Sequence, residues 1–200
     1  MTDDFKTLIT GAILAGGQAR RMGGEDKGLI KFRARHMIEY VIERLRPQVG
    51  ELLISANRNQ HYYAQLGNCP VLSDTFGNFA GPLAGMATCL QVAQTPYVLF
   101  APCDSPLLTP SLAWRLYAGL LHAGAQISVA QDGCRIHPLF TLVQRHLITD
   151  LLAFLNAGER QVSVWYPRHL WVKVDFSDVP ETFFNVNTPQ DHATLTQSIL

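Results

Sequence analysis

The sequence predicts an α/β fold with a mostly parallel β-sheet covered by helices on both faces. Short apolar runs alternate with longer segments whose apolar residues repeat at helical spacing. Prolines and glycines fall at the junctions, as they do at strand ends and helix starts. The chain contains no linker, internal repeat or low-complexity segment, which indicates one domain over residues 1–200.

The first half of the chain begins with an apolar run, Leu8 to Leu14, that predicts a buried strand. Apolar residues then repeat every three or four positions before Pro47 and predict a helix: Met37, Ile38, Val41, Ile42 and Leu45. Leu52 to Ala56 predicts a second strand, and His61 to Leu66 a short helical turn. A further helix is predicted from Gly81-Pro82, because proline is favoured in the first turn, and its apolar face follows: Leu83, Met86, Ala87 and Leu90.

The second half begins with a compact apolar strand, Tyr97 to Phe100, which precedes Pro102. Pro110 begins a helix with an apolar face at Leu112, Leu116 and Leu120. The remaining strands are predicted at 127–130, 139–143, 170–174 and 183–187. The last two patterns are less regular, and we expect one or two antiparallel strands in this half.

Composition narrows the possible classes of protein. Hydrophobic residues make up 48% of the chain and charged residues 16%, which is typical of a globular protein. Sixteen basic and sixteen acidic residues cancel, whereas nucleic-acid binding favours a strong basic excess. The four cysteines have no C-x-x-C spacing, the N-terminus does not resemble a signal peptide, and no apolar run approaches the ~20 residues of a membrane span. We therefore expect a cytoplasmic protein with neither nucleic-acid nor membrane partners.

A glycine-rich stretch, LAGGQARRMGGEDK, follows the first predicted strand and runs from Leu14 to Lys27. Its glycines allow backbone N–H groups to approach an anion closely, and its cations can balance phosphate charge. A P-loop is excluded because Lys27 is followed by Gly28 and not by Ser or Thr. The G-x-G-x-x-G spacing of a dinucleotide fingerprint is also missing from this stretch. A polyphosphate site is the interpretation favoured here, and a charged surface loop is the alternative.

This stretch resembles the L-A-G-G-x-x-x-R-M-x-x-x-x-K signature of nucleotidyltransferases with a Rossmann-like domain. The whole chain is similar to the molybdenum cofactor guanylyltransferase family. Further matching segments occur in that family's order: Ser55–Arg58, Asp74, Gly81–Met86, Pro102–Pro106, His137-Pro138, Gly158–Arg160, Val174–Asp178 and Asn185–Pro189. The resemblance implies a single-domain, three-layer Rossmann-like nucleotidyltransferase fold. Its nucleotide-binding part would span about 8–106 and its pterin-substrate part about 107–200.

The same resemblance implies an enzyme that transfers GMP from GTP to the terminal phosphate of molybdopterin and releases pyrophosphate. The expected cofactor is Mg²⁺, and transient contact with proteins that deliver molybdopterin or accept the product is a further expectation. Two alternatives remain open from the residues. One is a cytidylyltransferase or sugar-phosphate nucleotidyltransferase on the same fold, and the other is a catalytically silent nucleotide-binding adaptor.

Asp104 and Lys27 are the main candidate catalytic residues. Asp104 follows a buried strand, between two prolines that stiffen its loop, and one carboxylate suffices for Mg²⁺ when phosphates complete the coordination. Its pattern equally suits a turn or helix cap, and the resemblance favours the metal role. Lys27 is the expected phosphate contact. Arg21 is a candidate for stabilising the leaving pyrophosphate, with a solvated arginine as its alternative, and Arg20 is expected to face solvent.

The resemblance also assigns the two substrate sites. The expected nucleotide-binding residues are Leu14, Ala15, Gly16, Gly17, Lys27, Asn57, Asp74, Gly81 and Asp104. Asn57 and Asp74 would read the guanine or the ribose, although each is also an acceptable turn residue. Asn185, Asn187 and His137 would line the pterin-substrate site. The two asparagines, two positions apart on a predicted strand, would share one face, whereas a lone histidine such as His137 is more often structural.

Overall fold

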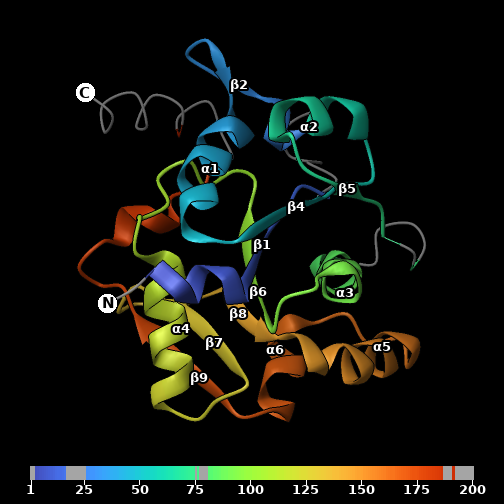
Figure 1. The fold of residues 1–200 in the computed structure, drawn as a ribbon, viewed down its shortest axis with the longest axis vertical. Helices are drawn as coiled ribbons and strands as arrows, with labels where there is room; N and C mark the ends of the chain where they lie inside the picture. Colours follow the sequence, from blue (N-terminus) through green and yellow to red (C-terminus); the bar gives the residue numbers. More distant parts are fainter. Residues whose placement is uncertain (1–2, 17–25, 75, 77–80, 187–190, 192–200) are drawn as a thin grey trace.

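The computed structural model describes residues 3–16, 26–74, 76, 81–186 and 191. Its centre is a seven-stranded sheet with the order β5-β4-β1-β6-β8-β7-β9 (Figure 1). The strands are β1 (Ile9–Leu14), β4 (Glu51–Ser55), β5 (Val71–Leu72), β6 (Tyr97–Pro102), β7 (Ile127–Gln131), β8 (Ile136–Gln144) and β9 (Trp171–Asp175). Among these strands β8 is the one that runs antiparallel to both neighbours, β6 and β7. The expected mostly parallel sheet with an antiparallel strand in the second half is confirmed.

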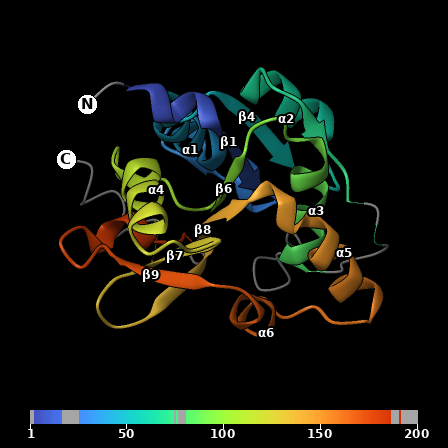
Figure 2. The same ribbon diagram turned by 60° about the horizontal axis from the view of Figure 1, so that its bottom comes forward.

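Helices cover both faces of the sheet, as predicted (Figure 2). The described helices are α1 (Met37–Leu45), α2 (Gln60–Gly67), α3 (Pro82–Val92), α4 (Leu112–His122), α5 (Ile148–Asn156) and α6 (Val162–Trp165). Residues of α1, α2 and α4 pack in the core on one face, and residues of α3, α5 and α6 pack on the other. The α/β architecture therefore has three layers, with the sheet between two layers of helices.

None of the described helices has the length and apolar character needed to cross a bilayer.

The central strands are buried on both sides because successive side chains point to opposite faces. In β1, Ile9 and Ile13 join the core under α1 and α4, while Ala12 joins the core under α3 and α5. Leu99 and Phe100 divide between the two cores in the same way. This explains why these strands have short, continuous apolar sequences.

Two small features were missed by the sequence patterns. A two-stranded antiparallel hairpin pairs β2 (Lys31–Phe32) with β3 (Arg35–His36), and its turn includes Arg33 with φ 53°. Helix α1 then begins with reciprocal contacts at its first turn, where the Glu39 carboxylate accepts a hydrogen bond from the His36 N–H at 2.6 Å. The hairpin has no glycine at its left-handed position, so it lacks the usual turn signal.

The predicted last strand over 183–187 is wrong for its described part. Phe183 ends a 3-10 helix, Pro180–Phe183, and residues 184–186 pair with no strand of the sheet. The Phe183 ring instead packs on His137, with ring centroids 3.9 Å apart, and also contacts Phe140. Aromatic burial therefore explains this apolar pattern, and Asn185 does not lie on the predicted strand. Asn187 itself lies outside the described residues.

Candidate active site

A cavity of about 400 Å³ lies at the carboxyl ends of three parallel strands. Register pairs Leu14 of β1 with Ser55 of β4 on one side and with Pro102 of β6 on the other. Each strand then continues directly into cavity-lining residues: Ala15 and Gly16, Asn57, and Cys103 and Asp104. Ligands of α/β proteins bind at this edge of the sheet. Each predicted nucleotide-binding residue that the structure describes thus lines this one cavity.

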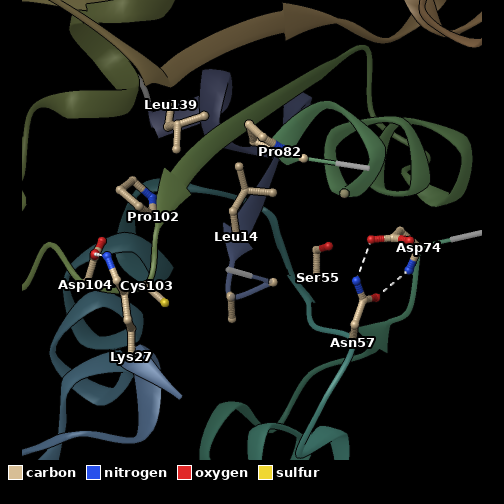
Figure 3. A pocket seen from close by; sticks show the side chains of 14 residues that line it. Leu14, Lys27, Ser55, Asn57, Asp74, Pro82, Pro102, Cys103, Asp104 and Leu139 are labelled. Atoms are coloured by element: carbon tan, nitrogen blue, oxygen red, sulfur yellow. Dashed lines mark hydrogen bonds and ion pairs between the residues drawn. The ribbon is translucent and has the colours of Figure 1, made fainter. Parts of the chain in front are cut away.

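Lys27 and Asp104 meet at one side of this cavity (Figure 3). The Lys27 ammonium lies 3.0 Å from Oδ2 of Asp104, and the two side chains are 28% and 8% exposed. They are 77 positions apart in the sequence, so the sheet brings them together. A nearly buried carboxylate beside a partly exposed cation can hold a metal ion and meet phosphate oxygens at the same point.

The loop that carries Asp104 is held by backbone hydrogen bonds from both sides. The Cys103 N–H donates to the Leu14 carbonyl at 3.1 Å, and the Val186 N–H donates to the Asp104 carbonyl at 3.0 Å. Burial, followed by the charge of Asp104, raises the pKa of the Cys103 thiol, so this cavity-lining group stays neutral. The carboxylate of Asp104 is therefore presented from a fixed loop beside an uncharged neighbour.

Asn57 and Asp74 form the opposite side of the cavity (Figure 3). The Asn57 amide donates to Oδ2 of Asp74 at 2.5 Å, and its carbonyl oxygen accepts from the Asp74 N–H at 2.9 Å. The Ser73 hydroxyl also donates to that oxygen at 3.2 Å. These bonds fix the asparagine side chain and hold the carboxylate of Asp74 at the cavity wall.

Two glycines shape the helix that borders the cavity. Gly81 has φ 80°, a conformation that residues with side chains adopt rarely, and it lies immediately before Pro82 of α3. At Gly85 a Cβ would lie 2.6 Å from the Ser55 hydroxyl and 3.4 Å from Leu14. The absence of a side chain at Gly85 lets the first turn of α3 approach the ends of β1 and β4.

The structure brings one predicted pterin-site residue close to Asp104. The Ser105 hydroxyl, which is fully buried, donates to Oδ1 of Asn185 at 2.5 Å, and Asn185 itself is exposed. That bond uses the carbonyl oxygen of the Asn185 amide. Asn185 therefore lies beside the loop that carries Asp104.

His137 is not among the residues that line this cavity. Its ring is stacked on Phe183, and its Nε2 lies 2.8 Å from Oδ2 of Asp132. The pKa of Asp132 is lowered, mainly by the N–H of Arg135 and then by His137, so the carboxylate stays ionised. Burial lowers the pKa of His137 despite this partner. The neutral ring therefore donates from Nε2 to Asp132.

The lowered pKa of His137 predicts that the folded protein becomes less stable in acid. The pKa of His137 in the folded state is below the ordinary value of 6.5. As the pH falls below 6.5, this residue therefore binds a proton more readily in the unfolded chain than in the folded chain. His137 therefore leaves the free energy of unfolding unchanged above pH 6.5 and lowers it as the pH falls below 6.5. We expect the melting temperature to fall between about pH 7.5 and 5.5, and to fall less in His137→Gln. Equal decreases in both proteins would contradict this account.

Gly17, Arg20, Arg21 and Asn187 lie outside the described residues. Sequence reasoning missed several residues of the cavity wall: Ser55, Pro82, Pro102, Cys103 and Leu139. Ser55 and Pro102 carried a usable signal, because each lies at or near the end of a predicted strand, Leu52 to Ala56 or Tyr97 to Phe100. Leu139 carried none, since its place in the wall depends on the insertion of β8 beside β6.

Comparison with known proteins identifies the family. The family model described as MobA-like NTP transferase domain matches residues 11–170. A molybdenum cofactor guanylyltransferase of Shewanella loihica is 47% identical over 191 residues, which cover 96% of this chain and 97% of the relative. That of Shewanella halifaxensis is also 47% identical, with 96% and 95% covered.

A solved structure shares the fold. Molybdopterin-guanine dinucleotide biosynthesis protein A from Archaeoglobus fulgidus superposes with a TM-score of 0.79 at 21% identity, and 96% of this chain and 100% of that chain are covered. The α/β fold is therefore common to both proteins. By family model and by sequence identity, this chain belongs to the MobA-like NTP transferases and, among them, to the molybdenum cofactor guanylyltransferase family.

Proposed function

We propose that the chain transfers GMP from GTP to the terminal phosphate of molybdopterin, releases pyrophosphate and forms a molybdopterin guanine dinucleotide. One observation carries the proposal: Lys27 and Asp104 meet at the side of a cavity formed by the carboxyl ends of β4, β1 and β6. The relatives at 47% identity are named for guanylyl transfer to the molybdenum cofactor. Neither the cytidylyl alternative nor the silent adaptor is favoured by these names.

Asp104 is the residue that would hold a divalent metal ion, Mg²⁺ in this proposal. The described residues contain no group of three or more His, Cys, Asp or Glu able to enclose a metal. One nearly buried carboxylate fits Mg²⁺, which uses one or two carboxylates together with substrate phosphates and water. When bound, such an ion balances the negative charge of the phosphates.

Lys27 would contact the phosphates from the same side of the cavity. Its ammonium is a compact charge at 3.0 Å from Asp104, so it can balance charge on the phosphoryl group that is transferred. Ala15 and Gly16, with Gly17, would offer backbone groups to the polyphosphate. Arg21 would stabilise the departing pyrophosphate.

Asp74 and Asn57 would select the nucleotide. An ionised carboxylate accepts hydrogen bonds and donates none, so Asp74 suits the N1–H and amino donors of guanine or the hydroxyls of ribose. The hydrogen bonds of Asn57 hold that carboxylate in place. Gly81 would admit the nucleotide at the start of α3.

The acceptor would approach from the side of Asn185, with Asn187 and His137 assigned to the same site. The attacking oxygen belongs to a phosphate that is already an anion, so no general base is needed. Its bond to the α-phosphorus forms as the bond to the leaving pyrophosphate oxygen breaks, and positioning with charge balance supplies the catalysis. Transient contact with proteins that bring molybdopterin or take the product remains part of the proposal, as does a cytoplasmic location.

Thermal melting with Mg²⁺ and each of GTP, ATP, CTP and UTP tests the nucleotide assignment. A ligand at about 100 times its Kd adds roughly 2.7 kcal/mol of stability. For a protein of this size, that corresponds to a shift of about 5–10 °C. We expect this shift with GTP alone, and we expect chelation of the metal by EDTA to reduce it.

The other results would change the conclusion. A shift with CTP in place of GTP would support the cytidylyl alternative, and the absence of any shift would support an adaptor. Release of pyrophosphate from GTP that requires molybdopterin would then separate the transferase from a protein that only binds nucleotide. Equal shifts with all four nucleotides would contradict the base-reading role of Asp74.

A further inference from the structure

Asp26, the residue immediately before Lys27, is bound by two side chains at the start of α2. The Tyr63 hydroxyl donates to Oδ1 of Asp26, and the Asn59 amide donates to Oδ2 at 3.0 Å. The two donors belong to one helical turn, since the Tyr63 N–H donates to the Asn59 carbonyl at 3.1 Å. Both oxygens of the carboxylate are thus held from one rigid element.

Tyr63 also contacts the residue on the other side of Lys27. A Cβ at Gly28 would lie 2.6 Å from the Tyr63 hydroxyl oxygen and 3.0 Å from its ring. Gly28 is therefore packed directly against the tyrosine, which is completely buried. Burial, followed by the influence of Cys103 and Asp26, raises the pKa of the Tyr63 hydroxyl, so the group remains a hydrogen-bond donor.

The backbone of Lys27 is consequently fixed at both ends. Lys27 lies between Asp26, which is hydrogen-bonded to α2, and Gly28, which packs on α2. The Leu29 N–H closes a 3-10 turn onto the Asp26 carbonyl at 2.9 Å. A lysine side chain has several rotatable bonds and a large conformational freedom, so a fixed starting point limits where its ammonium can lie.

We propose that Asp26, Asn59 and Tyr63, here called the Asp26 clamp, are positioning residues that set the ammonium of Lys27 beside Asp104. The inference rests on the proposed role of Lys27 at the transferred phosphate. The clamp acts through Lys27 and does not touch the substrate. Displacement of a reacting group by about 1 Å can reduce a rate by about 10²-fold, so such a clamp has a measurable effect on turnover.

A purely structural role is the competing explanation, because the Tyr63 ring belongs to the hydrophobic core under α1 and α4. Tyr63→Phe separates the two roles, since it keeps the ring and removes the hydroxyl oxygen. We expect the turnover number of Tyr63→Phe to fall about tenfold, within the range that loss of positioning produces. The matched control is Tyr62→Phe on the same helix, where the side chain is 58% exposed and turnover should not change.

The deciding experiment is a double-mutant cycle with Lys27→Met, followed by pyrophosphate release from GTP with Mg²⁺ and molybdopterin. If the clamp acts through Lys27, Tyr63→Phe lowers turnover in the wild-type background and has no further effect in Lys27→Met. Melting temperatures of the four proteins establish that each is folded at the assay temperature.

The remaining outcomes overturn the inference in distinguishable ways. Equal decreases in both backgrounds mean that the tyrosine hydroxyl has a general structural role. Full turnover of Tyr63→Phe, with an impaired Lys27→Met, removes the clamp and leaves the proposed role of Lys27 intact. Full turnover of Lys27→Met removes that role together with the inference.

Discussion

Asp104→Asn is expected to lower the rate of guanylyl transfer by about 10³-fold or more while the fold remains intact. The change removes one negative charge from a side chain that is 8% exposed, and it replaces one of the two oxygens of the proposed metal ligand with an NH2 group. Loss of several kcal/mol of charge stabilisation in the transition state corresponds to a rate decrease of this order. The measurement is pyrophosphate release from GTP in the presence of Mg²⁺ and molybdopterin.

A matched variant controls for the loss of a carboxylate as such. Asp4 is an exposed residue near the N-terminus and is not among the residues that line the cavity. Asp4→Asn should retain the turnover and the melting temperature of the wild type. Full activity of Asp104→Asn at ordinary Mg²⁺ concentration would remove Asp104 from the metal site, whatever the behaviour of the control.

Lys27→Met is expected to lower turnover by about 10²–10³-fold, the usual effect of losing one fixed charge contact to the reacting group. Methionine keeps much of the apolar length of the side chain and removes the ammonium that lies 3.0 Å from Asp104. The decrease should appear in the turnover number, because the charge of the phosphoryl group changes during transfer. The same pyrophosphate assay measures it.

Lys31 offers the control for this variant, since it is an exposed lysine four positions further along the chain, in β2. Lys31→Met should leave turnover unchanged. A decrease in turnover that was similar in the two lysine variants would indicate a general effect of charge. Retention of normal turnover by Lys27→Met would remove the lysine from the mechanism.

The sequence predicted those parts of the fold whose buried residues form a continuous apolar run or a regularly spaced apolar face. The strand that ends at Leu14 is buried along its length, and helix α1 buries residues at helical spacing between Met37 and Leu45. The irregular C-terminal part was harder, because Phe183 is buried by ring packing against His137 rather than by strand pairing. A pattern of apolar residues shows that side chains are buried, and it does not show which backbone conformation buries them.

The site was predictable to the extent that it depends on strand ends. Asp104 and Lys27 could be proposed because each lies near a strand end or a glycine-rich loop, and parallel strands bring such ends together. Leu139 could not, since the antiparallel insertion of β8 places it in the wall. The hydrogen bonds from Tyr63 and Asn59 to Asp26 were equally invisible, because they join side chains more than thirty positions apart.

The pairing of β6 with β8 has a consequence for attempts to reduce the enzyme to the part proposed to bind the nucleotide. Residues 8–106 include every strand on one side of β6, whereas the strand on its other side comes from residues 136–144. A fragment that ended near residue 106 would present β6 as a long apolar edge, with an unpaired row of backbone N–H and C=O groups. Such edges promote aggregation through strand addition. The strand that leads to Asp104 is interior only while the second half of the chain is attached, and we expect the fragment to aggregate where the full chain does not.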